Sequence, residues 1–527
     1  EGLRFLGMSL LGLDIGTTGT KGAVFSAEGR MIASAGRSYP LNLPDSACCE
    51  LETETVLTAV EEVIRECAAS ARAAGDPAGT AERDGRAGSA GAGRSSRGGC
   101  PPGDKAPRDP VRAIGISTMG DSLTLIDKAY RPLSNTVVGA ADRRAAVQAR
   151  LLEERFGRDE LFLRTGAVPG AFTALAKILW FRESRPLLYD GAARFTGLQE
   201  LVHLRLGVEP AMDYSLASRT MLMDVSAKDL AGSLFREIGL DGERFFPVAE
   251  ASSVRGRVSK DAALRLGLEG ETVVVTGGFD QCCAALGSGC IGPGVTALGV
   301  GTLEAIVPYL EKALFDSALL EGHHGCTFHV LPDGYSTLGY VTSSGGAIAW
   351  FDGRFMHGSG RLYSEEYLEG LLGGPSRVRL YPYVTGSGTP WIDEGRTASL
   401  HGLTLDSGID DMARALVEGI AFEVKANVED FHSAGVPVTV LKASGGGARS
   451  DRLLQLRADV TGLPVERVPV TEAGCLGAAF LAGLGTGVFS DAADIACLLG
   501  EGRVFEPRAE AAERYESAYR AYLEGRD

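Results

Sequence analysis

The sequence predicts an α/β protein that is divided into two domains. Its 527 residues, 45% of them hydrophobic, are too many for one ordinary core and enough to bury two. Short apolar runs typical of strands alternate along the chain with segments of helical periodicity. A hairpin with Gly-Thr at its turn occurs once in each half, at Asp14 to Thr17 and at Gly299 to Thr302, which indicates a duplicated architecture.

The first half begins with apolar segments between turn residues, a pattern that predicts a three-stranded antiparallel meander. Its expected strands are residues 10–13, 21–25 and 31–35, followed by strands 111–117 and 123–126 and by helices 53–71, 140–156 and 174–183. After a crossover at 254–258, the expected elements are strands 272–276 and 438–443, a hairpin over 295–307 and a helix over 411–433. An apolar stripe from Met412 to Phe431 predicts that this last helix faces the core. We expect an N-terminal domain over residues 8–255 and a C-terminal domain over 256–527.

Residues 71–110 differ in composition from the rest of the chain. These forty residues contain no Leu, Ile, Val, Phe or Met, and 23 of them are Gly, Ala or Pro. Such a stretch cannot offset its own ordering entropy, which predicts an exposed, disordered insertion that interrupts the N-terminal domain. Its six arginines are more typical of solubilising residues than of a binding surface.

Charge and cysteine usage exclude several function classes. The 52 basic and 68 acidic residues give a formal charge of −16, the wrong sign for a protein that neutralises nucleic-acid phosphates. The ten cysteines lack the spacing of a zinc site, so we expect reduced, mostly buried thiols of a cytoplasmic enzyme. The apolar run over residues 5–13 is too short for a membrane span and ends in an acid. We expect neither a nucleic acid nor a membrane as a partner.

The first segment with chemical potential runs from Asp14 to Lys21. Gly16 and Gly19 allow backbone amides to approach an anion, and Thr17, Thr18 and Thr20 add hydroxyl donors. Asp14, at the end of a strand, is an oxygen ligand suited to Mg²⁺ or its water shell. The alternative is a polar hairpin with a structural aspartate.

Two further segments combine glycine with polar residues after a strand. Asp280 follows Gly277-Gly278-Phe279 at a helix N-terminus, whose dipole is expected to keep it ionised so that it can accept a proton from a hydroxyl nucleophile. The alternative, an ordinary helix N-cap, is the more common use of such a residue. Gly445, Gly446 and Gly447 follow a strand and suit a flat ligand against bare backbone, the alternative being a flexible loop.

In this order, the segments resemble the motifs of the FGGY carbohydrate kinases, and the resemblance covers residues 8 to 525 apart from the insertion. It implies two ribonuclease-H-like domains of the actin-like ATPase superfamily, with an interdomain cleft, and an ATP-dependent, Mg²⁺-using kinase. It further implies that Asp280 is the general base and that Asp14 and Asp280 hold the metal. The residues that it implies for ATP are Gly16, Thr17, Thr18, Gly19, Lys21, Gly301, Thr302, Gly445, Gly446 and Gly447. Gln455 and Asp459 also fit the family pattern.

The acceptor is expected to contact Met119, Gly120, Asp121, Asp280 and Gln281. An Asp carboxylate in this position can accept hydrogen bonds from two sugar hydroxyls. Glycerol kinases have Arg-Glu and xylulokinases Met-His near this place, so Met119-Gly120-Asp121 matches neither. The Asp-Gln pair and the Gly-Thr-Leu-Glu hairpin resemble the fuculokinase-like branch most. Ser387-Gly388 stands where the family commonly has an acid-base pair.

The predicted reaction is therefore phosphorylation of a ketose, such as a pentulose or hexulose, or of a polyol. Xylulose, fuculose, gluconate and glycerol are the candidate acceptors. The rival hypotheses are a nucleotide-binding switch of the actin-like superfamily and a regulatory pseudokinase. The sequence leaves open whether the chain forms a homodimer.

Overall fold

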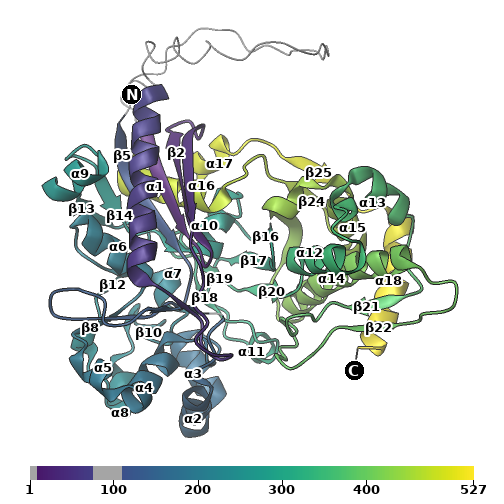
Figure 1. Cartoon of the computed structure of the whole chain (residues 1–527), viewed down its shortest axis with the longest axis horizontal. Coiled ribbons are helices and arrows are strands. Elements are labelled where there is room, and N and C mark those ends of the chain that lie inside the picture. The colour runs from purple at the N-terminus through teal and green to yellow at the C-terminus, as the bar shows by residue number, and fades with distance from the viewer. Residues whose placement is uncertain (1–8, 75–109, 140, 527) are drawn as a thin grey trace.

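The computed structural model describes residues 9–74, 110–139 and 141–526. Most of the predicted insertion and Cys100 lie outside the described residues. Two large sheets dominate the described structure, one built largely from the first half of the chain and one from the second (Figure 1).

The first sheet has seven strands in the order β13-β14-β5-β1-β2-β3, with β15 also paired to β5. Their bounds are β1 Ser9–Ile15, β2 Gly19–Ser26, β3 Met31–Ser38, β5 Val111–Thr118, β13 Val254–Arg257, β14 Val273–Val275 and β15 Gly278–Phe279. The antiparallel meander of β1, β2 and β3 is confirmed, and β5 runs parallel to β1. The sheet extends past the predicted boundary at 255/256, and where the two domains divide remains a prediction.

The second sheet has eight strands in the order β18-β19-β17-β16-β23-β24-β25, with β20 also paired to β17. Their bounds are β16 Gly294–Val300, β17 Glu304–Leu310, β18 Thr327–Phe328, β19 Tyr335–Ser336, β20 Gly339–Val341, β23 Val438–Ser444, β24 Val465–Arg467 and β25 Arg503–Phe505. The β16–β17 hairpin has β23 parallel to β16, just as the β1–β2 hairpin has β5 parallel to β1. The predicted duplication is confirmed.

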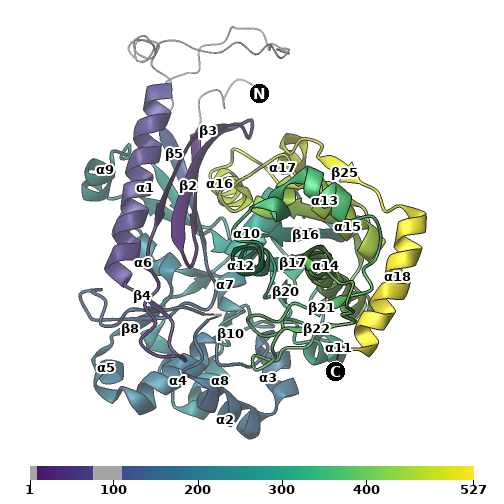
Figure 2. The ribbon, with the colours of Figure 1, turned by 45° about the vertical axis from the view of Figure 1, so that its right-hand side comes forward.

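Two helices join the sheets. These helices, α16 (Ala473–Gly485) and α10 (Asp280–Gly287), lie on the side of the first sheet that faces the second sheet. A third helix, α1 (Thr53–Ala74), lies on the outer face of the first sheet (Figures 1 and 2). A β-carbon on Gly12 of β1 would overlap the carbonyl of Cys475, so α16 packs directly on the sheet backbone. A β-carbon on Gly477 would likewise overlap the carbonyl of Cys283, which fixes α16 against α10. This close packing requires small residues, as the sequence supplies.

On the second sheet, α14 (Ile409–Ser433) contacts β17, β20 and β23, and α15 (Asp451–Thr461) lies between α14 and α18 (Ala509–Glu524). The predicted core-facing stripe of α14 is confirmed because Leu416, Ile420, Val424, Val428 and Phe431 are all buried. The other segments that bear on the site are α6 Leu198–Leu206, β9 Met212–Asp213, α7 Tyr214–Ala217, α12 Gly345–Phe355, α13 Glu365–Leu371, β21 Arg379–Tyr381 and β22 Ser399–His401.

A separate group of helices follows β6 (Thr124–Ile126) and has its own apolar core. It comprises α2 Ala146–Phe156, α3 Arg158–Thr165, α4 Ala174–Ser184, α5 Pro186–Gly191 and α8 Gly232–Ile238. The predicted start of α2 at residue 140 is wrong. Asp142 is buried and accepts hydrogen bonds from the Cys49 amide and the Arg144 guanidinium, which holds this segment outside the helix.

The nine described cysteines are free, and all but Cys48 and Cys497 are buried, as predicted. Among the described residues, no helix has the length and apolar character needed to cross a membrane.

Candidate active site

The carboxyl ends of three parallel strands bring the polar residues of the first half together. In the strand register, Asp14 of β1 pairs with Ser117 of β5, and Ser117 also pairs with Gly278 of β15. Asp280 follows β15 directly, as the first residue of α10. The two aspartates that the sequence singled out therefore lie at the same edge of one sheet.

Asp14 is held by neighbours on two elements. The Ser117 hydroxyl donates a hydrogen bond to Asp14 Oδ1 at 3.0 Å. A β-carbon on Gly474, near the start of α16, would lie 2.8 Å from Asp14 Oδ2, so the helix approaches the carboxylate closely. Burial raises the pKa of Asp14, and Ser117 and Lys21 oppose that rise.

Asp280 has the protonation behaviour of a base that works near neutral pH. Burial first, and then the negative charge of Asp14, raise its pKa to about 7, although the Gln281 amide donates to Oδ1 at 2.7 Å. We expected the helix N-terminus to keep this carboxyl ionised. The expectation underestimated burial, which outweighs the favourable contacts at the helix start.

The first Gly-Thr hairpin is a tight turn between β1 and β2. The Gly16 amide donates to the Gly19 carbonyl at 3.0 Å, and a β-carbon on Gly19 would lie 2.6 Å from the Arg37 carbonyl. Thr18, at the tip, is exposed. The Lys21 ammonium, on β2, pairs with the Glu472 carboxylate at 2.9 Å at the surface. The turn therefore presents backbone and hydroxyl groups, while the lysine is engaged by an acid.

The second Gly-Thr hairpin is fixed by a buried ion pair. Glu304, the first residue of β17, is buried and accepts hydrogen bonds from Arg457 of α15 and, at 2.6 Å, from the Ser344 hydroxyl. The Gly345 amide donates to the Gly301 carbonyl at 3.1 Å, which sets the start of α12 against the turn. Gly301 and Thr302 themselves are exposed.

The triple glycine meets this hairpin at the ends of adjacent strands. Ser444 of β23 pairs with Gly299 of β16, so Gly445 follows beside Val300. Gly445 has φ 93° and ψ −179°, a conformation essentially restricted to glycine, and its β-carbon would lie 2.7 Å from the Val300 carbonyl. Gly445 and Gly446 are exposed, so they present bare backbone next to the second hairpin.

The predicted acceptor residues lie in different environments. Met119 is buried in the core of the first sheet, with its sulfur 3.9 Å from the Thr17 hydroxyl. Asp121 is only 4% exposed and has φ 57°. The side-chain amide oxygen of Gln281 lies 3.9 Å from the place that a β-carbon on Gly299 of the second sheet would occupy. A small cavity beside Asp121 is also lined by Met119 and Gln199.

Sequence reasoning missed two basic residues at this place. Arg219 follows α7, and its Nη2 donates to Asp121 Oδ2 at 3.1 Å. Its guanidinium lies 4.2 Å from the centre of the Phe279 ring. A side chain on Gly120 would obstruct this position, so the glycine leaves room for the guanidinium. The buried Lys177 ammonium donates to the Asp121 carbonyl at 2.9 Å. No local pattern in the sequence marks either residue, because both contacts join distant segments.

Asp459 has a structural environment. Its carboxylate is buried and accepts hydrogen bonds from the Arg508 backbone amide at 2.8 Å and from Arg508 Nη2 at 2.6 Å. Gln455 Nε2 donates to the same carboxylate at 3.1 Å. These contacts tie α15 to the segment that leads into α18.

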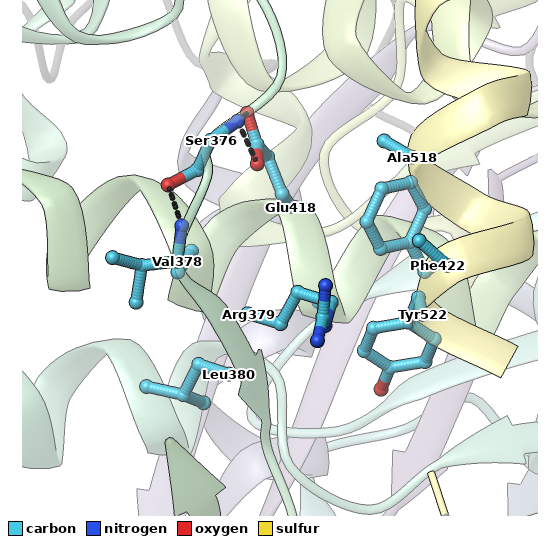
Figure 3. A pocket seen from close by; sticks show the side chains of 11 residues that line it. Ser376, Val378, Arg379, Leu380, Glu418, Phe422, Ala518 and Tyr522 are labelled. Carbon is cyan, nitrogen blue, oxygen red and sulfur yellow. Dashed lines mark hydrogen bonds between the residues drawn. The ribbon is translucent and has the colours of Figure 1, made fainter. Parts of the chain in front are cut away.

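A second cavity lies between β21, α14 and α18 (Figure 3). Glu418 is buried on its wall and accepts a hydrogen bond from the Ser376 amide at 2.9 Å and from the Tyr515 hydroxyl at 3.3 Å. Burial raises the pKa of Glu418 to about 8. Its lining residues include none that the sequence predicted for the active site.

The donor set around Asp14 fits magnesium in one specific way. Among the described residues, no group of three or more His, Cys, Asp or Glu side chains is arranged to hold a metal. Mg²⁺ bound with a nucleotide usually takes only one or two protein carboxylates and completes its shell with phosphates and water. Asp14 and Asp280, two carboxylates close enough for one to raise the pKa of the other, fit that pattern.

Comparison with known proteins identifies the class. The model of the FGGY family of carbohydrate kinases, N-terminal domain, matches residues 103–287, and the model of the C-terminal domain of the same family matches residues 369–486. Xylulose kinase of Bacillus subtilis is 26% identical over 97% of this chain and 95% of its own length. Glycerol kinase of Gloeobacter violaceus is 29% identical over 94% of this chain and 92% of its own length.

Solved structures show the same fold. Ligand-bound xylulose kinase from Lactobacillus acidophilus superposes with a TM-score of 0.84 at 22% identity, over 98% of this chain and 97% of that chain. Plasmodium falciparum glycerol kinase with ADP gives a TM-score of 0.81 at 18% identity, over 98% of both chains. The predicted α/β fold of the actin-like ATPase type is confirmed.

The fold and the matched family models define a phosphotransferase, an enzyme that moves a phosphoryl group from ATP to a sugar or polyol. The chain belongs to the FGGY family of carbohydrate kinases. This membership confirms the predicted enzyme class, a carbohydrate kinase.

Proposed function

We propose that this enzyme transfers the γ-phosphoryl group of ATP to a hydroxyl of a ketose or polyol, with Asp280 as general base. The single observation that carries the proposal is the position of Asp280, at the edge of the sheet that also ends in Asp14 and Ser117. Phosphoryl transfer needs mainly positioning and electrostatic stabilisation, so a base and a charged clamp at one edge are sufficient groups.

Asp280 accepts the proton of the attacking hydroxyl. A pKa of about 7 supports this role, because a general base works best when its pKa lies near the operating pH. The attacking oxygen approaches the γ-phosphorus in line with the leaving oxygen.

The two hairpins bind the phosphates from opposite sheets. The turn from Gly16 to Gly19, with the Thr17 and Thr18 hydroxyls, contacts one side of the phosphate chain, and Gly301 and Thr302 contact the other. The Gly16 amide, which donates to the Gly19 carbonyl, stabilises this turn. Lys21 would have to leave Glu472 to join them, which costs little because the pair is exposed. Gly445, Gly446 and Gly447 lie against the adenosine.

Asp14, with Asp280, would hold Mg²⁺ through its water shell. The ion would neutralise charge on the β- and γ-phosphates when bound. The Ser117 hydroxyl orients the Asp14 carboxylate for this role.

Met119, Gly120, Asp121 and Gln281 form the acceptor side in this proposal. The curated relatives are named for xylulose, glycerol and gluconate, so the acceptor is a sugar, a polyol or a related acid of that size. The resemblance to the fuculokinase-like branch, a cytoplasmic location and a homodimer remain predictions.

The test is ADP release over a panel of pentuloses, hexuloses, polyols and gluconate, each compared with ATP alone. The proposal expects one compound to stimulate ADP release strongly, with a phosphorylated sugar or polyol as the product. If ADP forms at the same rate without any acceptor, or no acceptor is phosphorylated, the proposal is wrong.

A further inference from the structure

Arg219 and Asp121 form a buried ion pair with polar atoms left unused. Asp121 Oδ2 accepts from Arg219 Nη2, but Asp121 Oδ1 and Arg219 Nε, both shielded from water, have no hydrogen-bond partner among the described residues. A buried donor or acceptor without a partner costs about 1–3 kcal/mol, so a ligand that satisfies both atoms gains their hydrogen bonds. A free donor and a free acceptor on one ion pair match a sugar hydroxyl, which accepts and donates at once.

The pair lies next to the proposed base. The Ser215 hydroxyl of α7 donates to the Phe279 amide at 2.8 Å, which ties the segment carrying Arg219 to the residue before Asp280. The Phe279 ring packs against the Arg219 guanidinium in a cation–π contact. The positive charge of Arg219 lies close enough to Asp280 to oppose the rise of its pKa.

A contact with Lys177 holds the backbone of Asp121. Its φ of 57° is uncommon for a residue with a side chain, and the buried Lys177 ammonium stabilises this backbone by donating to the Asp121 carbonyl. A strained, fixed backbone with an unsatisfied carboxylate oxygen is typical of a binding residue.

From these contacts we infer that Arg219 is an acceptor-binding residue which, paired with Asp121, makes the site select neutral polyhydroxyl compounds over sugar acids. The inference rests on the proposed function and deepens it. Turning the Arg219 guanidinium away from Oδ2 exposes carboxylate oxygens and N–H donors to substrate hydroxyls. Arg219 keeps 18% of its side chain exposed, so it can make this movement.

Charge balance supplies the selectivity. The positive charge of Arg219 is matched by Asp121, Lys177 beside Asp121 adds a second positive charge, and Asp14 and Asp280 add two further carboxyl groups near the site. A carboxylate on the substrate would therefore meet no cation that lacks a carboxyl group nearby. Neutral ketoses and polyols do not need such a cation.

The experiment compares Arg219→Met with Arg164→Met, whose side chain is similarly exposed, 20%, and pairs at 2.8 Å with Glu237, a more exposed partner than Asp121. Arg219→Met should raise KM for the best neutral acceptor by about ten-fold or more, the loss expected for a hydrogen bond to a charged group. KM for ATP should stay within about two-fold, and Arg164→Met should change neither constant. An unchanged acceptor KM in a folded Arg219→Met protein would overturn the inference.

Asp121→Asn tests the selectivity separately. It leaves the charge of Arg219 unmatched, so kcat/KM for gluconate should rise relative to that for the neutral acceptor. A ratio that stays constant or moves toward the neutral compound contradicts the charge argument. If none of the compounds stimulates ADP release by the parent protein, the proposed function fails. Calorimetric binding of the same compounds without ATP then tests the inference about Arg219. Weaker binding of the neutral compounds by Arg219→Met supports the inference, and equal or absent binding rejects it.

Discussion

The charge on Asp14 raises the pKa of Asp280, although the two residues are separated by most of the N-terminal half of the chain. Strands β1 and β15 carry them to either side of β5, where Ser117 pairs with both strands in the register. Two carboxyl groups this close together also provide the charge that a magnesium–nucleotide complex needs.

Asp14→Asn should lower the pKa of Asp280 in the ligand-free, metal-free protein, because it removes a neighbouring negative charge. The pKa of Asp280 in the parent is about 7, so Asp280 there loses its proton as the pH rises through that value. Potentiometric titration of each protein against its Asp280→Asn derivative isolates this proton. An identical midpoint in the two backgrounds would show that the carboxyl groups do not interact.

Gly445→Ala should raise KM for ATP and lower stability. Its φ of 93° with extended ψ is nearly closed to alanine, a strain on the order of 1–3 kcal/mol, and the new β-carbon would press on Val300. Gly270→Ala is the control, because its β-carbon would meet nothing within 4 Å and Gly270 lies outside the proposed ATP site. Steady-state kinetics and thermal unfolding of both variants give the comparison, and equal effects would remove the argument for this loop.

Lys21→Met should raise KM for ATP several-fold while changing the free energy of unfolding by less than about 1 kcal/mol, since an exposed ion pair adds little stability. Glu472→Gln frees Lys21 and should leave KM for ATP equal or lower. The two variants are compared at low and high salt. A Lys21→Met protein with parental KM for ATP would exclude the lysine from phosphate binding.

Glu418→Gln should stabilise the protein more at pH 8 than at pH 5. The folded pKa of Glu418, about 8, lies above the usual value for a glutamate, so the folded state holds its proton longer than the unfolded state. The free energy of unfolding of the parent therefore falls as pH rises from about 5 to 8. The glutamine variant does not titrate at this position, so it avoids this loss of stability, which is on the order of 2 kcal/mol. Denaturant unfolding at both pH values checks this, with exposed Glu513→Gln as control. A pH-independent difference would contradict it.

The sequence predicted the strands and hairpins well because their signals are local. Alternating apolar residues and Gly-Thr turns mark β1, β2, β16 and β17 without any knowledge of neighbours. Parallel pairing of β16 and β23 then places Gly445 beside Val300, next to the second Gly-Thr turn.

What the sequence could not predict depends on contacts between distant segments. Arg219 reaches Asp121 and Lys21 reaches Glu472 only after the sheets assemble. The protonation of Asp280 was misjudged for the same reason. The helix start is visible in the sequence, whereas the burial that dominates its pKa is a property of the folded chain.

The most direct test of the account is turnover by Asp280→Asn with the best acceptor of the panel. Asn keeps the size of the side chain but cannot accept the proton, so kcat should fall by about a hundred-fold or more, in the range of general-base catalysis. ATP affinity, measured by calorimetry, should stay within a few-fold, and Asp159→Asn, a change in the exposed first turn of α3, should be fully active. An Asp280→Asn protein that keeps the parental turnover would contradict the assignment of the base, and with it the proposed site.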